Sequence, residues 1–309
     1  MSERRTLQVA AVIRLDQFLV QVWPELRRRQ LRQMIQAGEV LINGQAARQS
    51  GQYLHPGAVV VEMPTPRPAA PAKPEIVACL PLEVYHEDES LLVVEKHAGM
   101  ATHSTRGEVA LAQQLRERFP ESAHVGGLER AGIIRRMDVE ASGLLLVARA
   151  EGAYRALKRA VKRRLVESRY SVLVEGQLTG EDLIVAPIGN VKATRQRLAV
   201  AREGRPARTF YRALRHYREE GQAYTLLEVR PETARLHQIR VHLSWCGYPV
   251  VGDRVYGSRH HQSILPDRLF LHLGVLDFPH PVTGEPLHVE SALPAALQSI
   301  LRFMARSKG

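Results

Sequence analysis

The sequence has very few cysteines and no long apolar run. Cys79 and Cys246 are the only cysteines among 309 residues, and neither belongs to a Cys-x-x-Cys pair. This pattern excludes a disulfide framework and a thiolate zinc site, and it predicts that both side chains are buried as small apolar groups. No apolar stretch is long enough to span a bilayer, and no signal-type apolar core follows residues 1–5. We therefore expect a cytoplasmic protein with no membrane partner.

The chain also lacks the glycine-rich fingerprints of a P-loop or a dinucleotide-binding fold, so no nucleotide cofactor is expected. His237 and His242 lie five residues apart, which is the wrong spacing for two metal ligands on one face of a helix. No glutamate follows His237 directly, as a zinc hydrolase of the His-Glu-x-x-His kind requires. A metal-dependent hydrolase that uses some of the 13 histidines is therefore disfavoured, and no bound metal is expected.

The chain carries an excess of positive charge. Lys and Arg number 43 against 32 Asp and Glu, giving a formal net charge of +11. Such a balance favours a polyanionic partner, either nucleic acid or an anionic membrane surface, and composition alone does not choose between them. A chain of this length can form one large core with a small additional domain.

Residues 13–63 have the pattern of a small domain. Leu15, Phe18, Leu19 and Val22 follow helical spacing, and a second helical set is Leu31, Met34 and Ile35. Asn43-Gly44 predicts a tight turn after a short strand, and residues 59–61 predict a later strand. Four arginines crowd the start and outer side of the second helix, namely Arg27, Arg28, Arg29 and Arg32.

The order of these phrases resembles the S4 RNA-binding module, most clearly in residues 14–19 and 35–44. The resemblance implies that the four arginines contact RNA phosphates. Such binding has an affinity that falls with salt and little specificity for the base sequence of the RNA. An arginine-rich helix face that is merely solvated is the alternative. Residues 64–74 contain five prolines and predict a semi-extended linker, so the catalytic domain is expected over residues 75–309.

Residues 135–149 organise the larger domain. A short polar segment carries Asp138, a Ser142-Gly143 pair suits a turn, and an apolar run of strand length follows. Arg135 and Arg136, just upstream of Asp138, favour a carboxylate that offers a negative charge, as a nucleophile or base needs. The plainer alternative is an aspartate that caps a turn or pairs with Arg136.

Other predicted elements contribute two further candidates. Tyr170 lies near the start of a predicted strand at residues 168–176. Leu236, Ile239 and Leu243 form an apolar helical stripe that leaves Arg240 half buried, so this arginine needs an anionic partner, and Asp138 is the obvious one. The remaining expected elements are a hairpin at 82–96, a cationic helix at 154–165, strands at 207–214, 224–229, 269–278 and 287–290, and a final amphipathic helix.

The Asp138 segment resembles the catalytic motif of RluA-type RNA pseudouridine synthases, roughly His-Arg-Leu-Asp-x-x-Thr-Ser-Gly-Leu-Leu. The chain keeps Arg136, Asp138, Ser142 and Gly143, but has Arg135, Met137 and Ala141 at three motif positions. Further family phrases follow in the family order. They are Lys96–Gly99 with His97 for proline, the Tyr170 strand, residues 233–240 with Ala234 and Leu236 as departures, and the loop 252–257.

The resemblance implies an α+β pseudouridine synthase fold with a central mixed, mainly antiparallel sheet flanked by helices and loops, plus the small N-terminal S4-like domain. It implies isomerisation of uridine in RNA, with large-subunit ribosomal RNA favoured and transfer RNA open as partner. By the same resemblance Asp138 is the catalytic group, Tyr170 stacks on the extruded uracil, Arg240 pairs with Asp138, and Arg136 fills the gap left by the flipped base. Neither metal nor cofactor is implied, and a monomer is the default.

One alternative of another class is a non-catalytic RNA-binding or ribosome-assembly protein that keeps the fold. Arg135 and Ala141 are its support, while the retained Asp138, Tyr170 and Arg240 favour an enzyme. The motif leaves open whether Asp138 attacks the ribose, attacks the base or removes a ribose proton.

Overall fold

The computed structural model describes residues 2–23, 31, 34–35, 37–47, 49, 51–64, 81–103, 110–127, 130–191, 197–257, 264–265 and 268–306. Arg27, Arg28, Arg29, Arg32 and Cys79 lie outside the described residues, as does most of the proposed linker. The chain forms two compact units, Met1–Pro74 and Glu75–Gly309. The finer boundaries expected from the sequence remain a prediction.

The N-terminal unit is built around helix α1 (Leu15–Val22). Its strands are β1 (Ser2–Val9), β2 (Ile13–Arg14), β3 (Leu41–Ile42), β4 (Gln45–Ala46), β5 (Tyr53–Leu54) and β6 (Gly57–Pro64), with sheet orders β1-β6-β3-β4 and β2-β5. Leu15, Leu19, Leu31 and Ile35 are all fully buried in one core, as their helical spacing predicts. Asn43 and Gly44 form the expected turn, and both have a positive φ.

The larger unit contains a nine-stranded sheet with the order β11-β14-β15-β10-β16-β9-β8-β7, and β17 pairs with β16. Only β9 and β16 pair in parallel among these described strands. The bounds are β7 (Val84–Glu87), β8 (Leu91–Lys96), β9 (Ser142–Ala148), β10 (Glu167–Glu175), β11 (Glu181–Val185), β14 (Arg208–Glu219), β15 (Gln222–Pro231), β16 (Leu271–Pro279) and β17 (Pro286–Glu290), with a separate pair β12 (Ile188–Asn190) and β13 (Leu198–Val200). The predicted mixed, mainly antiparallel sheet of an α+β fold is confirmed.

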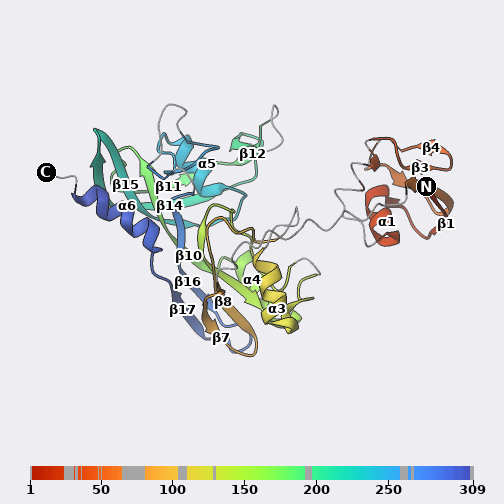
Figure 1. Ribbon diagram of the computed structural model, residues 1–309, viewed down its shortest axis with the longest axis horizontal. Helices are drawn as coiled ribbons and strands as arrows, with labels where there is room; N and C mark the ends of the chain where they lie inside the picture. Colours follow the sequence, from red (N-terminus) through yellow and green to blue (C-terminus); the bar gives the residue numbers. More distant parts are fainter. Residues whose placement is uncertain are drawn as a thin grey trace. The chain divides into compact units, whose positions relative to one another are not determined.

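Helices cover both faces of the sheet at β8 and β9. Because side chains alternate along a strand, Leu144 and Leu146 pack with α4 (Glu151–Lys162), while Leu145 and Val147 pack with α3 (Leu111–Arg118). A short 3-10 turn, η1 (Pro120–Ser122), follows α3. Both helices lie beside β8 in Figure 1. Double coverage explains why residues 91–94 of β8 and 144–148 of β9 are apolar without alternation.

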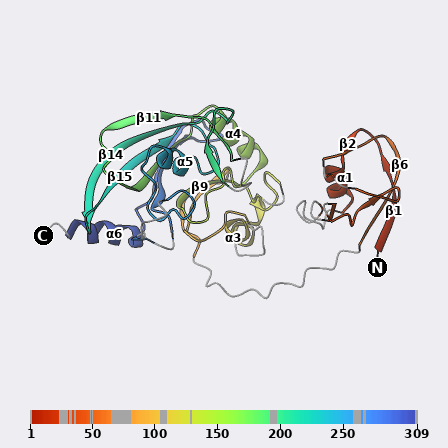
Figure 2. The same ribbon diagram turned by 90° about the horizontal axis from the view of Figure 1, so that it is seen from above.

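Two more helices pack on opposite faces of β10 and β15. Ile239 and Leu243 of α5 (Gln238–Trp245) join a core with Val172 and Val229. Leu297 and Met304 of α6 (Ala295–Arg306) join another with Leu173, Tyr217, Tyr224 and Phe270. Figure 2 shows β14 and β15 curving over α5. The curved sheet therefore holds α5 against the strand that carries Tyr170.

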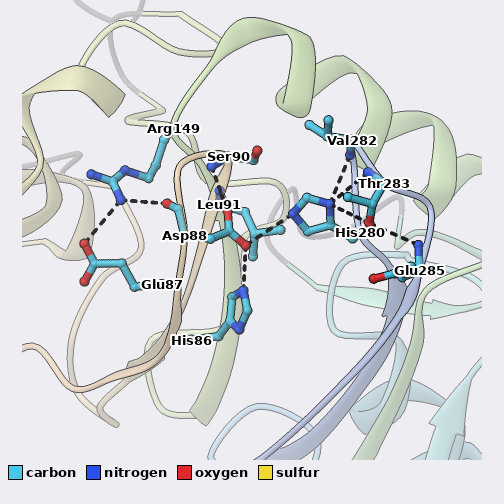
Figure 3. A network of polar contacts seen from close by, with 10 residues as sticks. All are labelled: His86, Glu87, Asp88, Ser90, Leu91, Arg149, His280, Val282, Thr283 and Glu285. Carbon is cyan, nitrogen blue, oxygen red and sulfur yellow. Dashed lines mark hydrogen bonds and ion pairs between the residues drawn. The ribbon is translucent and has the colours of Figure 1, made fainter.

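The predicted hairpin at the sheet edge is confirmed, and a polar network fixes its acidic turn (Figure 3). The Asp88 carboxylate accepts hydrogen bonds from the backbone N–H groups of Ser90 and Leu91, at 2.7 and 3.0 Å. His86 Nε2 and His280 Nε2 lie 2.7 and 3.2 Å from Asp88 Oδ2. Burial raises the pKa of Asp88, but these hydrogen bonds outweigh it and lower the pKa to about 2. The network ties the β7–β8 turn to the turn between β16 and β17.

The Ser142-Gly143 pair does not form a turn, contrary to the expectation from sequence. Ser142 and Gly143 are the first two residues of β9, and they pair with His272 and Leu273 of the parallel strand β16. Gly143 has φ +127°, and a Cβ there would lie 2.3 Å from the carbonyl oxygen of Leu273. Glycine is thus needed where two backbones approach closely, not where the chain reverses. Cys246 also differs from expectation, because it is only partly buried.

A buried polar chain lies under the start of β9. Ser142 Oγ is 3.0 Å from His272 Nδ1, and His272 Nε2 is 3.1 Å from Ser291 Oγ. Arg268 Nη2 also donates to Ser142 Oγ at 2.8 Å. His272 is only 1% exposed, and its burial, together with the charge of Arg268, lowers its pKa from 6.5 to about 4. The imidazole is therefore neutral in the folded protein at neutral pH.

This shift predicts a pH dependence of stability. The unfolded chain binds a proton on His272 below its ordinary pKa, whereas the folded chain resists it until about pH 4, so stability falls as pH falls through that window. By about pH 5 the loss is about 2 kcal/mol. We expect His272→Gln to lack this part of the acid sensitivity. Urea unfolding of both proteins at about pH 7.5 and about pH 5 checks it, and equal losses in the two would contradict it.

Candidate active site

The loop that carries Asp138 is held by the segment 96–102. Thr102 Oγ1 donates to the carbonyl oxygen of Met137 at 3.0 Å and accepts from its N–H at 3.1 Å. On the other side of Asp138, the N–H of Gly99 donates to the carbonyl oxygen of Val139 at 2.8 Å. The backbone is therefore fixed on both sides of the carboxylate, as a precisely aimed group requires.

Lys96 is the centre of this support. Its side chain is fully buried, and its ammonium donates to three backbone carbonyl oxygens, those of His97, Met100 and Val139, at 2.9, 2.9 and 3.2 Å. Burial lowers the pKa of Lys96 to about 7, although the charges of Asp138 and Glu140 raise it. The sequence reading assigned no role to this lysine, and its place in the Lys96–Gly99 phrase was the only signal.

Arg240 projects from α5 and forms the ion pair with Asp138 that the sequence predicts. Its Nη1 donates to Asp138 Oδ2 at 2.8 Å, and only 3% of the arginine side chain is exposed. The predicted helical stripe of Leu236, Ile239 and Leu243 is only partly confirmed, because α5 begins at Gln238 and His237 has a left-handed conformation with φ +53°. Leu236 therefore lies outside the helix and is 43% exposed. Gln238 fixes this start, since its Oε1 accepts from Thr233 Oγ1 at 2.8 Å and from the N–H of Arg235 at 3.1 Å.

Asp253 is a second partner of Arg240 that sequence reasoning missed. Arg240 donates from Nε and Nη2 to the two oxygens of Asp253, at 2.7 and 2.9 Å, in a two-point contact. Asp253 also accepts from the N–H groups of Val255 and Tyr256, both at 2.9 Å. Burial raises the pKa of Asp253, but Arg240 outweighs burial and lowers it. Burial likewise lowers the pKa of Arg240, and the two carboxylates reverse this and raise it.

The three residues proposed as catalytic line one cavity of about 80 Å³. Asp138 comes from the loop before β9, Tyr170 from β10 and Arg240 from α5, and Arg136 lines the same cavity with an exposed side chain. Burial raises the pKa of Tyr170, so its phenol is neutral at ordinary pH. The cavity therefore combines a carboxylate, a fixed cation and a neutral aromatic ring.

His237 is another group at the carboxylate. Its Nε2 is 3.8 Å from Asp138 Oδ1, and its Nδ1 is 3.0 Å from the hydroxyl of Tyr256. Burial lowers the pKa of His237 below its usual 6.5. A neutral imidazole that bonds to Tyr256 helps to hold the 252–257 loop, and with it Asp253, against α5.

A cationic groove of about 770 Å³ continues from Asp138. Its arginines and lysine are Arg130, Arg135, Arg136, Lys158, Arg205 and Arg235, whereas Asp138 and Glu203 are the only carboxylates among the described residues that line it. Burial and the charges of Arg130 and Arg135 lower the pKa of Lys158. Neighbouring positive charges repel one another, and a bound polyanion such as an RNA phosphate backbone relieves this repulsion.

A sequence model of the RNA pseudouridylate synthase family matches residues 90–245, about half of the chain. The chain belongs to this family. A model of the S4 domain matches residues 13–60 of the synthase. The predicted family, the S4 domain and the isomerase activity on RNA are therefore confirmed.

Relatives resemble the synthase over nearly its whole length. An uncharacterised RNA pseudouridine synthase YlyB of Bacillus subtilis is 34% identical and the match covers 95% of each chain. Ribosomal large subunit pseudouridine synthase D of Pseudomonas aeruginosa is 35% identical over 96% of this chain and 93% of its own. The solved structure of human RNA pseudouridylate synthase domain containing 1 superposes with a TM-score of 0.59 at 27% identity, over 73% of the synthase and 95% of the human chain.

In the part of the synthase that the structure describes, no helix is both long and apolar enough to cross a membrane.

Proposed function

We propose that this synthase isomerises uridine in large-subunit ribosomal RNA and that Asp138 begins the reaction. The observation that carries the proposal is the cavity in which Asp138, Tyr170 and Arg240 meet, at the end of a groove lined by cations. The choice of RNA rests on relatives named ribosomal large subunit pseudouridine synthase D and on the S4 domain. Transfer RNA is the competing substrate.

The chemistry breaks the bond between N1 of uracil and C1′ of ribose and forms a bond between C5 and C1′. The C5 proton is released and N1 takes up a proton, so the reaction is redox-neutral. Asp138 supplies the nucleophile or base that starts this exchange. Its contact with Arg240 aims the carboxylate, since the guanidinium itself is held by Asp253.

The other groups hold the substrate. Tyr170 offers its ring to the extruded uracil, and a neutral phenol avoids repulsion with a charge on the base. Arg136 stands exposed where the cavity meets the groove, a position suited to the gap that a flipped nucleotide leaves in its stack. Arg27, Arg28, Arg29 and Arg32 of the S4 domain add phosphate contacts in this proposal.

The proposal is tested by tritium release from unmodified large-subunit ribosomal RNA labelled at uridine C5. We expect the synthase to release tritium from this RNA and not from unmodified transfer RNA. Release from transfer RNA alone would overturn the choice of substrate. If neither RNA nor ribosome-assembly intermediates release tritium although all bind, the catalytic assignment fails.

A further inference from the structure

A second cavity of about 430 Å³ adjoins the cavity of Asp138. The two share Arg135, Pro231, Thr233 and Ala234 in their walls. The second cavity also reaches Phe210 on β14, Glu167 at the start of β10 and Glu232 after β15. A ligand that enters the first cavity thus has a neighbouring space directly beside it.

One wall of this second cavity is a stacking surface. Phe210 and Arg230 are cross-strand partners, and the guanidinium carbon of Arg230 lies 4.4 Å from the centre of the Phe210 ring. Val161 and Val166 add apolar surface. Aromatic rings and guanidinium planes are the groups on which proteins stack unpaired nucleobases.

The charges of the second cavity differ from those of the groove. Glu167 and Glu232 stand among its arginines, so it is unsuited to a phosphate. Glu232 Oε2 accepts from Arg208 Nε at 2.6 Å. Glu167 Oε1 is 3.6 Å from Arg230 Nη1, longer than a hydrogen bond, which leaves this carboxylate with capacity to accept from a ligand.

We propose that the second cavity binds a nucleobase next to the target uridine in the same RNA strand, and that this base carries an exocyclic amino group. The inference rests on the proposed function for the identity of the neighbouring nucleotide. Phe210 and Arg230 supply the stack, and Glu167 accepts from the amino group. Uracil is disfavoured because it has no amino group, and its one N–H donor on that edge lies between two carbonyl oxygens that the same carboxylate repels.

The test uses fluorescent ten-nucleotide RNAs, each with one central uridine flanked by adenylate or by cytidylate, together with oligouridylate, as probes of the full-length synthase. We expect wild type to bind the first two more tightly than oligouridylate. Phe210→Leu keeps an apolar side chain but removes the ring, and it should weaken binding of all three by about fivefold or more. Glu167→Gln should retain binding but lose the preference for amino-bearing bases. Phe303→Leu, an exposed aromatic on α6, is the matched control and should behave as wild type.

Single-turnover tritium release from ribosomal RNA supplies the second readout. Phe210→Leu should raise the half-saturating enzyme concentration by about fivefold or more with little change in the maximal rate. Unchanged probe affinity in Phe210→Leu, or an unchanged base preference in Glu167→Gln, overturns the proposal. If Phe210→Leu fails to fold, the base preference of Glu167→Gln still tests the proposal, because Glu167 is exposed at the start of its strand. If wild type prefers amino-bearing bases but releases no tritium, the proposed function is rejected, while the proposal that the second cavity binds a nucleobase is kept.

Discussion

Replacing Asp138 by asparagine is expected to lower the single-turnover rate of tritium release by at least about 10,000-fold, the scale on which removal of a nucleophile acts. Asparagine has the shape of aspartate, and its carbonyl oxygen can still accept from Arg240 Nη1. It has no negative charge with which to attack carbon or take a proton. The rate is measured with enzyme in excess over labelled ribosomal RNA, so that product release does not mask the chemical step.

Two controls separate lost chemistry from lost structure. Arg240 keeps its two-point contact with Asp253 in the variant, so Asp138→Asn should fold and bind RNA with nearly the affinity of wild type. Glu140→Gln removes an exposed carboxylate two residues away on the same loop and should keep the wild-type rate. A rate for Asp138→Asn within tenfold of wild type would remove Asp138 from the chemistry and make it a positioning residue.

The sequence predicts the parts of the site that lie inside contiguous motifs. Asp138 lies in the loop before β9 and Tyr170 near the start of β10, two strands that their apolar residues reveal. Ile239 and Leu243 of the predicted apolar stripe are buried, but Leu236 precedes α5 and is 43% exposed, and Arg240 is buried, not half buried. A buried cation needs an anion, so the ion pair with Asp138 could be expected across a separation of 102 residues. The catalytic roles of these residues stay predictions until variants are assayed.

Other features depend on contacts that no local pattern reports. Asp253 lies in a glycine-bounded loop that resembles an ordinary turn, and only the packing of this loop on α5 brings it to Arg240. Gly143 reads as a turn residue because its neighbour is serine, whereas the parallel strand β16 is what requires glycine there. Strand β1 begins with the charged run Glu3-Arg4-Arg5, and only Leu7 and Val9 alternate as apolar residues, so its pairing with β6 was not foreseen.

The Arg240–Asp253 contact should also dominate the stability of the site. Asp253→Asn leaves a 3%-exposed guanidinium with Asp138 as its one remaining carboxylate among the described contacts. Breaking a buried pair from one side costs about 3–5 kcal/mol of unfolding free energy. Because the folded pKa of Asp253 is lowered, its contribution is present above the ordinary value of 3.8 and is lost as pH falls through the folded pKa. Urea unfolding should therefore show a gap between wild type and variant that narrows in acid.

A double variant separates the stabilising role of this contact from its role in catalysis. In Arg240→Met/Asp253→Asn the buried guanidinium is gone, and the amide oxygen at position 253 can still accept from the N–H groups of Val255 and Tyr256, so much of the stability lost in Asp253→Asn should return. Tritium release should not return, because Asp138 has lost the cation that aims it. If the double variant regains activity together with stability, Arg240 serves only the packing of α5. If Asp253→Asn is as stable as wild type, the Arg240 guanidinium is hydrated in the variant. In that case the buried ion pair does not determine the stability of the site.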